Sequence, residues 1–115
     1  MSETFELLTR ARQTPLVAIL RGLLPAEAQA VGEALVESGF RTLEVPLNRP
    51  GALECIATLA RTLPADAIVG GGTMLTVADV EAVHAAGGRL MVSPNCDVVV
   101  IRRAVELGML CAPGV

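Results

Sequence analysis

Short apolar segments recur along this sequence roughly every 20 to 25 residues, and each ends in polar or turn-forming residues. Stretches in which apolar residues follow helical spacing lie between them. The segment ends are Ala18–Gly22, Thr42–Asn48, Ile68–Thr73, Met91–Asn95 and Cys111–Gly114. This alternation predicts consecutive βα units, in which parallel strands lie side by side and helices cover them.

The expected elements follow one another without a linker, which predicts a single domain over residues 1–115. Because the first strand is apolar throughout, we expect it to be covered on both faces. Phe5, Leu8 and Ala11 are expected to share one face of the first helix. Helices are expected at 3–12, 25–38, 50–63, 76–86 and 97–107, and strands at Leu16–Leu20, Phe40–Val45, Ala67–Val69, Leu90–Val92 and Met109–Ala112.

The number of βα units constrains the architecture. Four βα units and a fifth strand make roughly half of an eight-stranded (β/α)₈ barrel, which typically needs about 250 residues. The sequence has 115 residues. We therefore expect an α/β fold of the TIM-barrel type, present as an N-terminal helix, about four βα units and a fifth strand. An open doubly wound sheet of five parallel strands is the alternative.

Charge and cysteine content exclude several classes of partner. The formal net charge is -3 and no basic cluster is present, which argues against nucleic acid as a partner. The N-terminus lacks the pattern of a signal peptide and no apolar stretch is long enough for a bilayer, so we expect no membrane partner. The three widely spaced cysteines, Cys55, Cys96 and Cys111, fit a reduced, cytoplasmic setting.

Glu44 ends an otherwise apolar strand and is the first candidate for chemistry. In closed parallel barrels the reactive groups collect where the strands end. A carboxylate is costly to bury in such a place without a purpose. The structural alternative is an ion pair with Arg21 or Arg41.

Gly70–Thr73 follows the third expected strand and resembles a phosphate loop only superficially, because it lacks the lysine of that motif. We expect a tight strand-to-helix turn that needs a positive φ and whose backbone also approaches a substrate carboxylate. The Thr73 hydroxyl would extend this anion site. Arg21 fits the recognition of a carboxylate as well, and a partner of Glu44 is its alternative role.

Five motifs in this order resemble the KDPG/KHG aldolase family, and the resemblance covers nearly all of the chain. The motifs are Pro15–Gly22, Leu43–Asn48, Val69–Thr73, Val92–Asn95 and Ala112–Val115. Within the family, the Pro-Leu-Asn run after Glu44 is similar to the 2-dehydro-3-deoxy-6-phosphogalactonate aldolases, because gluconate-type members usually carry Thr-Leu-Arg there. Arg49 follows Asn48 directly, so 2-dehydro-3-deoxy-6-phosphogluconate or 4-hydroxy-2-oxoglutarate aldolase is the alternative.

The resemblance implies a homotrimeric (β/α)₈ barrel without metal or cofactor. Its class I retro-aldol reaction passes through a lysine Schiff base and yields pyruvate and glyceraldehyde 3-phosphate from a phosphorylated 2-keto-3-deoxy sugar acid. Glu44 would be the general acid/base. The implied substrate-binding residues are Arg21, Asn48, Gly72, Thr73 and Pro94.

Lysine is absent from the sequence, in which all nine basic residues are arginine. The Schiff-base lysine of the family lies on the sixth strand and the phosphate pocket follows the seventh and eighth, so we expect this chain to hold the acid/base half of the site. A non-catalytic half-barrel that acts only by association is one alternative. A metal-dependent pyruvate aldolase is another, but it needs a carboxylate and histidine cluster, and His84 is the single histidine.

Overall fold

The computed structural model describes residues 3–115, in which five parallel strands form one sheet. The strands are β1 (Val17–Ile19), β2 (Thr42–Pro46), β3 (Ile68–Gly72), β4 (Leu90–Ser93) and β5 (Leu110–Pro113). They lie in the order β1-β2-β3-β4-β5, and each neighbouring pair is parallel. Strands of a β/α barrel follow one another in this sequential order, whereas a doubly wound sheet reverses its order. The described residues therefore contradict the doubly wound alternative.

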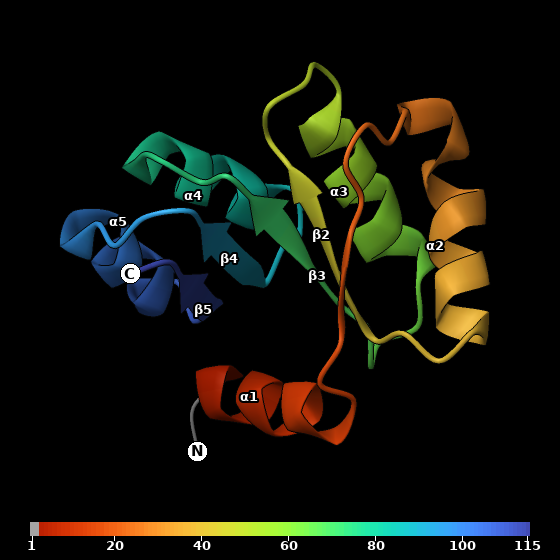
Figure 1. Ribbon diagram of the computed structural model, residues 1–115, viewed down its shortest axis with the longest axis horizontal. Helices are drawn as coiled ribbons and strands as arrows, with labels where there is room; N and C mark the ends of the chain where they lie inside the picture. The colour runs from red at the N-terminus through yellow and green to blue at the C-terminus, as the bar shows by residue number, and fades with distance from the viewer. Residues whose placement is uncertain (1–2) are drawn as a thin grey trace.

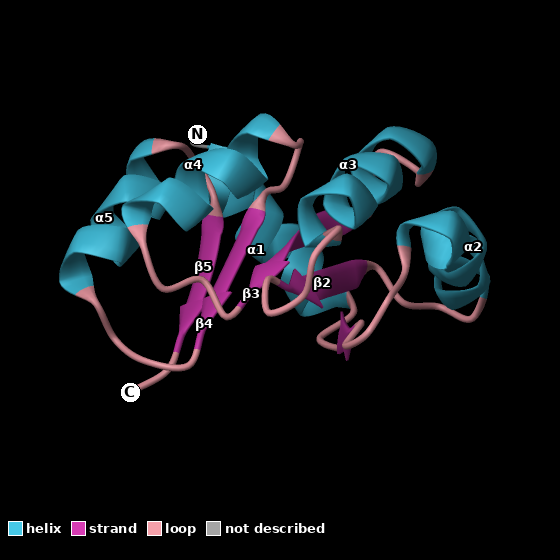
Figure 2. Cartoon of the chain, turned by 90° about the horizontal axis from the view of Figure 1, so that it is seen from above, coloured by secondary structure: helices cyan, strands magenta, loops and turns pink. Residues whose placement is uncertain are grey.

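Four of the five α-helices lie along one face of the sheet, as Figures 1 and 2 show. They are α2 (Ala28–Glu37), α3 (Ala52–Thr62), α4 (Val77–Ala85) and α5 (Val98–Glu106). The remaining helix, α1 (Glu3–Gln13), lies across the ends where the strands begin (Figure 1). We call the face under α2–α5 the outer face and the opposite one the inner face, because a barrel carries its helices outside.

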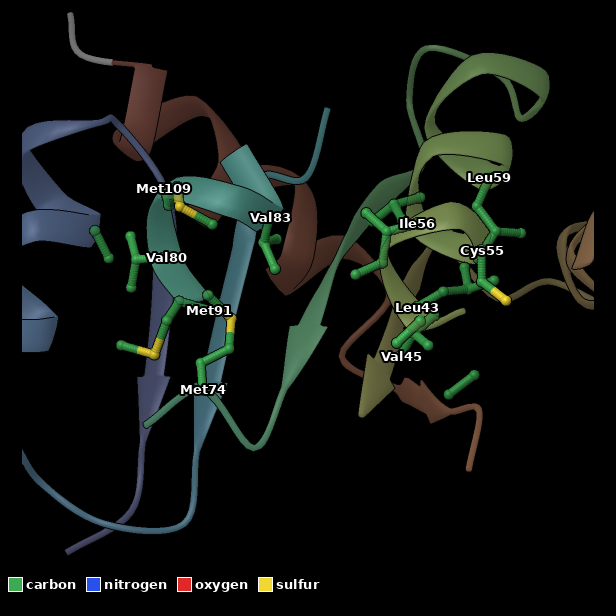
Figure 3. Close-up of a cluster of buried hydrophobic side chains, with 14 of the residues drawn as sticks. Leu43, Val45, Cys55, Ile56, Leu59, Met74, Val80, Val83, Met91 and Met109 are labelled. Carbon is green, nitrogen blue, oxygen red and sulfur yellow. The ribbon is translucent and has the colours of Figure 1, made fainter. Parts of the chain in front are cut away.

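The outer face holds the main core. Leu43 and Val45 of β2 point toward Cys55, Ile56 and Leu59 of α3 (Figure 3). Further along the sheet, the core continues through buried residues of β3, β4, α4 and the loops, namely Val69, Met74, Val80, Val83, Met91 and Met109. Alternate residues of each strand point to this face, so their neighbours in sequence point to the inner face.

The inner face is covered only near the start of the strands. There Leu7 of α1 packs with Ile68 and Leu90. Val17 and Ile19 are 50% and 62% exposed, so the expectation that the first strand is covered on both faces is wrong for the described chain. The reason is that no described element packs over β1 on this side, although its sequence is apolar enough for burial.

The first helix also differs from expectation in the face that it buries. Leu7 is 1% exposed, whereas Phe5 and Leu8 are 51% and 37% exposed. A groove of about 320 Å³ lies between α1 and the inner face, with Leu8 and Val17 among its lining residues. The helix boundaries were predicted well, but the burying face depends on the tertiary contact with β3 and β4.

Local capping explains where two helices begin. In α4 the Thr76 hydroxyl accepts a hydrogen bond from the Asp79 amide at 3.1 Å, and the Asp79 carboxylate accepts one from the Thr76 amide at 3.2 Å. This reciprocal pair is a capping box. At α5 the Asp97 carboxylate accepts from the Val99 amide at 3.0 Å. The helix expected over 25–38 begins instead with a 3₁₀ turn, Pro25–Glu27.

Candidate active site

The predicted site residues come from the first four strands and gather at the edge where these strands end. Glu44 lies within β2, in register with Ile19 of β1 and Gly70 of β3. Gly72 is the last residue of β3, in register with Pro46. The other candidates follow the strand ends within two residues: Arg21 after β1, Asn48 after β2, Thr73 after β3 and Pro94 after β4. Since the strands are parallel and in register, all six lie at one edge of the sheet.

Glu44 points to the inner face and is buried there, with 4% of its surface exposed. Its carboxylate lies against Gly72: a Cβ atom on Gly72 would be 2.6 Å from Cδ and 2.8 Å from Oε1 of Glu44. No described residue donates a hydrogen bond to its buried Oε2. Arg41, one candidate ion-pair partner, binds Asp66 at 3.1 Å instead. The carboxylate is thus held without the partners that a structural ion pair would provide.

Burial raises the pKa of Glu44 above the ordinary value of a glutamate, and the positive charge of Arg21 opposes this rise. Desolvation is the larger effect, because it disfavours the charged form of a carboxylate. A raised pKa brings the titration of Glu44 nearer to neutral pH, where an acid that both gives and takes protons works best. The geometry therefore allows proton transfer at this edge.

Thr73 adopts the left-handed backbone conformation, with φ of 53°. It is the one non-glycine residue with a positive φ among residues 3–115. A β-branched residue is an outlier in this region, and the strain costs roughly 1–2 kcal/mol. The hydrogen bond from the Met74 amide to the Val92 carbonyl, at 3.1 Å, ties the next residue to β4. Such strain clusters at functional sites.

The glycines before Thr73 differ from expectation. We expected a turn with positive φ, but Gly70, Gly71 and Gly72 form the end of β3, and the positive φ falls on Thr73. A Cβ on Gly70 would lie 2.6 Å from the Leu90 carbonyl carbon. Glycine is therefore needed here because neighbouring strands leave no room for a side chain. Rules based on local sequence do not describe such contacts between strands.

Two guanidinium groups lie near this edge. Arg21 and Arg49 are exposed, and neither forms an ion pair within the described chain. Arg49 reaches back to the end of β1: its Nη1 would be 2.9 Å from a Cβ on Gly22. Nothing in the local sequence indicates that the Arg49 side chain crosses to the neighbouring loop. Arg21 acts on the charge of Glu44, and Arg49 adds a second positive charge without an ion-pair partner in the loop after β1, which favours an anionic ligand at this edge.

The loop after β4 is held by a residue that the sequence analysis did not single out. Ser93 is buried, and its hydroxyl donates a hydrogen bond to the Asn95 carbonyl at 2.8 Å. Pro94 itself is exposed, as is Asn48. The Ser-Pro-Asn order was the available signal, since hydroxyl side chains often bond the backbone two residues on.

No group of three or more His, Cys, Asp or Glu side chains within residues 3–115 could hold a metal ion. In the same part of the chain, no helix combines the length and apolar character that crossing a membrane requires.

Comparison with known proteins assigns the family. A family model for KDPG and KHG aldolases matches residues 7–115. A probable 2-dehydro-3-deoxy-6-phosphogalactonate aldolase of Rhizobium meliloti (strain 1021) is 50% identical over 103 residues, which is 90% of this chain and 49% of that protein. The 2-dehydro-3-deoxy-6-phosphogalactonate aldolase of Escherichia coli (strain K12) is 42% identical over 100 residues, 87% of this chain and 49% of that protein.

Solved structures agree with the fold. A structure described as native KDPGal superimposes with a TM-score of 0.86 at 41% identity and covers 90% of this chain and 50% of its own. The 2-keto-3-deoxy-6-phosphogluconate aldolase of Zymomonas mobilis ZM4 gives a TM-score of 0.85 at 32% identity, with 97% and 53% covered. The chain spans about half the length of the curated relatives it matches. The predicted resemblance is confirmed, and this chain belongs to the KDPG and KHG aldolase family.

Proposed function

We propose that residues 1–115 are the N-terminal half of a class I aldolase barrel that cleaves 2-dehydro-3-deoxy-6-phosphogalactonate to pyruvate and glyceraldehyde 3-phosphate. The observation that supports this most is the Glu44 carboxylate, which is buried and unpaired at the strand ends of a chain from an aldolase family. The two relatives at 50% and 42% identity carry the galactonate name, whereas a gluconate-type relative of Treponema pallidum reaches 33%.

In this proposal a lysine outside the chain attacks the substrate ketone, whose oxygen takes up a proton to form a carbinolamine. Loss of water leaves a protonated imine. As the proton of the C4 hydroxyl is removed, the C3–C4 bond breaks. The electron pair of that bond moves toward the imine nitrogen, and C4 becomes the aldehyde carbon. Glyceraldehyde 3-phosphate leaves, the enamine takes a proton at C3, and hydrolysis releases pyruvate and the free amine. Glu44 moves these protons, because its raised pKa makes both of its forms accessible.

The remaining candidate residues bind the substrate in this proposal. Arg21 supplies positive charge beside the pyruvyl carboxylate, which Thr73 and the backbone at Gly72 hold. Asn48 contacts the sugar acid, and Pro94 forms one wall of the pocket. We further propose that the whole enzyme is an oligomer, as the family resemblance implies.

A chimera tests the proposal, because the chain has no lysine of its own. The chain would be joined to the second half of the Rhizobium meliloti relative, and pyruvate release would be measured with each C4 epimer of the substrate. We expect faster cleavage of the galactonate epimer, and a drop of roughly 100-fold or more in turnover for Glu44→Gln. The relative with its own first half is the control.

Three results would count against the proposal. A chimera that folds as the relative does but cleaves neither epimer would favour a non-catalytic half-barrel. If the chimera preferred the gluconate epimer, the proposed substrate would be wrong. Full turnover by Glu44→Gln would remove this residue from the mechanism. Borohydride trapping of pyruvate adds a direct check: we expect an adduct in the chimera and none on a side chain of the 115-residue chain.

A further inference from the structure

We infer that Gly72 is a positioning residue for Glu44: the missing side chain at residue 72 makes the space in which the carboxylate lies. This inference rests on the proposed function of Glu44. It assigns to Gly72 a role that acts through the acid/base residue, in addition to any contact with substrate.

The carboxylate occupies the place that a side chain on Gly72 would take. Glu44 is in register with Gly70, two residues before Gly72, so its side chain leans toward the strand ends and across onto β3. A Cβ on Gly72 would lie 2.6 Å from Cδ and 2.8 Å from Oε1 of Glu44. Real Cβ atoms essentially never approach another heavy atom closer than 3.0 Å. Alanine at residue 72 and the present position of the carboxylate therefore exclude each other.

Ile19 of β1 shows why the direction in which the Glu44 side chain leans is important. On the opposite side of β2, Ile19 is in register with Glu44 and is 62% exposed. A carboxylate that leaned toward β1 would meet solvent above Ile19, whereas over Gly72 it is buried and its Oε2 has no hydrogen-bond donor. The same burial raises the pKa of Glu44, and Arg21 is the charged group that opposes it. The absence of a side chain at residue 72 thus allows the Glu44 carboxylate to lie in its buried position.

The backbone gives no other reason for a glycine at this place. Gly72 lies in an extended strand, unlike Gly22 and Gly51, which have φ of 79° and 86°. Its neighbour Gly71 faces the outer side of the sheet, where a Cβ would meet Val83 and Met74 side-chain atoms at 2.9 and 3.0 Å. Gly71→Ala is therefore a control in the same strand: it adds the same methyl group, with a milder clash, on the face away from Glu44.

The test is an NMR titration of the 115-residue chain carrying ¹³C-labelled glutamate, in the parent, Gly72→Ala and Gly71→Ala proteins, each in the Val17→Thr/Ile19→Thr background and at a concentration at which light scattering shows a monomer. We expect the Glu44 midpoint to move down toward those of the exposed glutamates in Gly72→Ala, because the displaced carboxylate becomes solvated, and to stay in place in Gly71→Ala. A Glu44 midpoint that is the same in all three proteins would overturn the inference. The chimera's activity does not enter this measurement, so an inactive chimera would reject the proposed function separately.

A second variant covers the case in which Gly72→Ala does not fold. Removing the carboxylate by Glu44→Ala leaves room for the new methyl group, so the Gly72→Ala/Glu44→Ala protein should fold, with a urea midpoint close to that of Glu44→Ala alone. An unfolded double variant would show that Gly72 serves the backbone and not Glu44, and would refute the positioning role. This comparison of Glu44→Ala with the double variant does not need a folded Gly72→Ala protein; where that protein folds, the four proteins form a double-mutant cycle.

Discussion

Replacing Thr73 by glycine should stabilise the chain while it weakens the proposed site. Thr73 has φ of 53°, a conformation that costs a β-branched residue roughly 1–2 kcal/mol and a glycine almost nothing. Glycine also loses about 0.5–1 kcal/mol through the greater freedom of the unfolded chain. Because no described residue receives or gives a hydrogen bond at the Thr73 hydroxyl, little else is lost. The difference between these two ranges is about 0–1.5 kcal/mol, and we expect a net gain near its middle, about 0.75 kcal/mol.

The gain corresponds to a rise of roughly 2–5 °C in Tm for a chain of this size. Urea and thermal unfolding of Thr73→Gly and the parent, at one protein concentration, would measure it. Thr76→Gly is the matched control, since Thr76 lies three residues along with φ of -136° and caps α4. That substitution should cost a few tenths of a kcal/mol. Thr73→Ala keeps the Cβ atom and therefore should not show the gain.

The chimera adds the functional half of this prediction. If the Thr73 hydroxyl binds the substrate carboxylate, its loss removes a hydrogen bond to a charged group, worth about 1.5–3 kcal/mol. We expect kcat/KM to fall at least roughly tenfold in Thr73→Gly, with the Tm raised. A Thr73→Gly protein less stable than Thr76→Gly would refute the assignment of strain. Unchanged kcat/KM would refute the binding role.

Two further predictions concern Glu44 and the inner face. Since burial raises the folded-state pKa of Glu44, its protonated form stabilises the fold below about pH 4, and this contribution is lost as the pH rises through the folded-state pKa. The free energy of unfolding of Glu44→Gln should therefore rise relative to that of the parent as the pH rises. The rise is about 1.4 kcal/mol for each pH unit between the unfolded-state and folded-state pKa of Glu44. A difference in urea unfolding that does not depend on pH would contradict this. The isolated chain should associate through its inner face, and Val17→Thr/Ile19→Thr should weaken the association while Val99→Thr, 63% exposed on α5, should not. A stable monomer in light scattering would contradict it.

The order of strands and helices could be predicted from the sequence because it depends on local patterns. Apolar runs, Pro25 and Pro50 near helix starts and the Thr76–Asp79 capping box each act within a few residues. The end of β3 could not be predicted in the same way. Glycine is a poor strand former, so the sequence pattern predicts that the strand ends at Val69. Backbone pairing with β2 and β4 extends it to Gly72.

The candidate site shows the same division. Glu44 could be identified from a single strand, because an acid inside an apolar run is costly to bury and therefore conspicuous. Its orientation over Gly72 could not, since it depends on the register between β2 and β3. The strain at Thr73 was also hidden, because the glycines before it offered an easier place for a positive φ. The prediction that β1 is buried on both faces was wrong for a third reason. An apolar sequence shows that a strand can be buried, but not which element packs against it.

Within residues 3–115, Glu44 of β2 lies between β1 and β3. Ile19 flanks the acid on one side, Gly72 receives its carboxylate on the other, and Arg21 at the end of β1 acts on its charge. The burial that raises the pKa of Glu44 is therefore present in a sheet whose inner face is covered only near the start of the strands. In the proposed function, a lysine amine from the second half of the barrel would lie over the inner face. It would meet a Glu44 carboxylate that is already oriented and whose pKa is already raised toward neutral pH. The Glu44 titration in the monomeric Val17→Thr/Ile19→Thr chain should accordingly resemble that in the chimera without substrate. A midpoint raised only in the chimera would show that the second half, not β3, buries the acid.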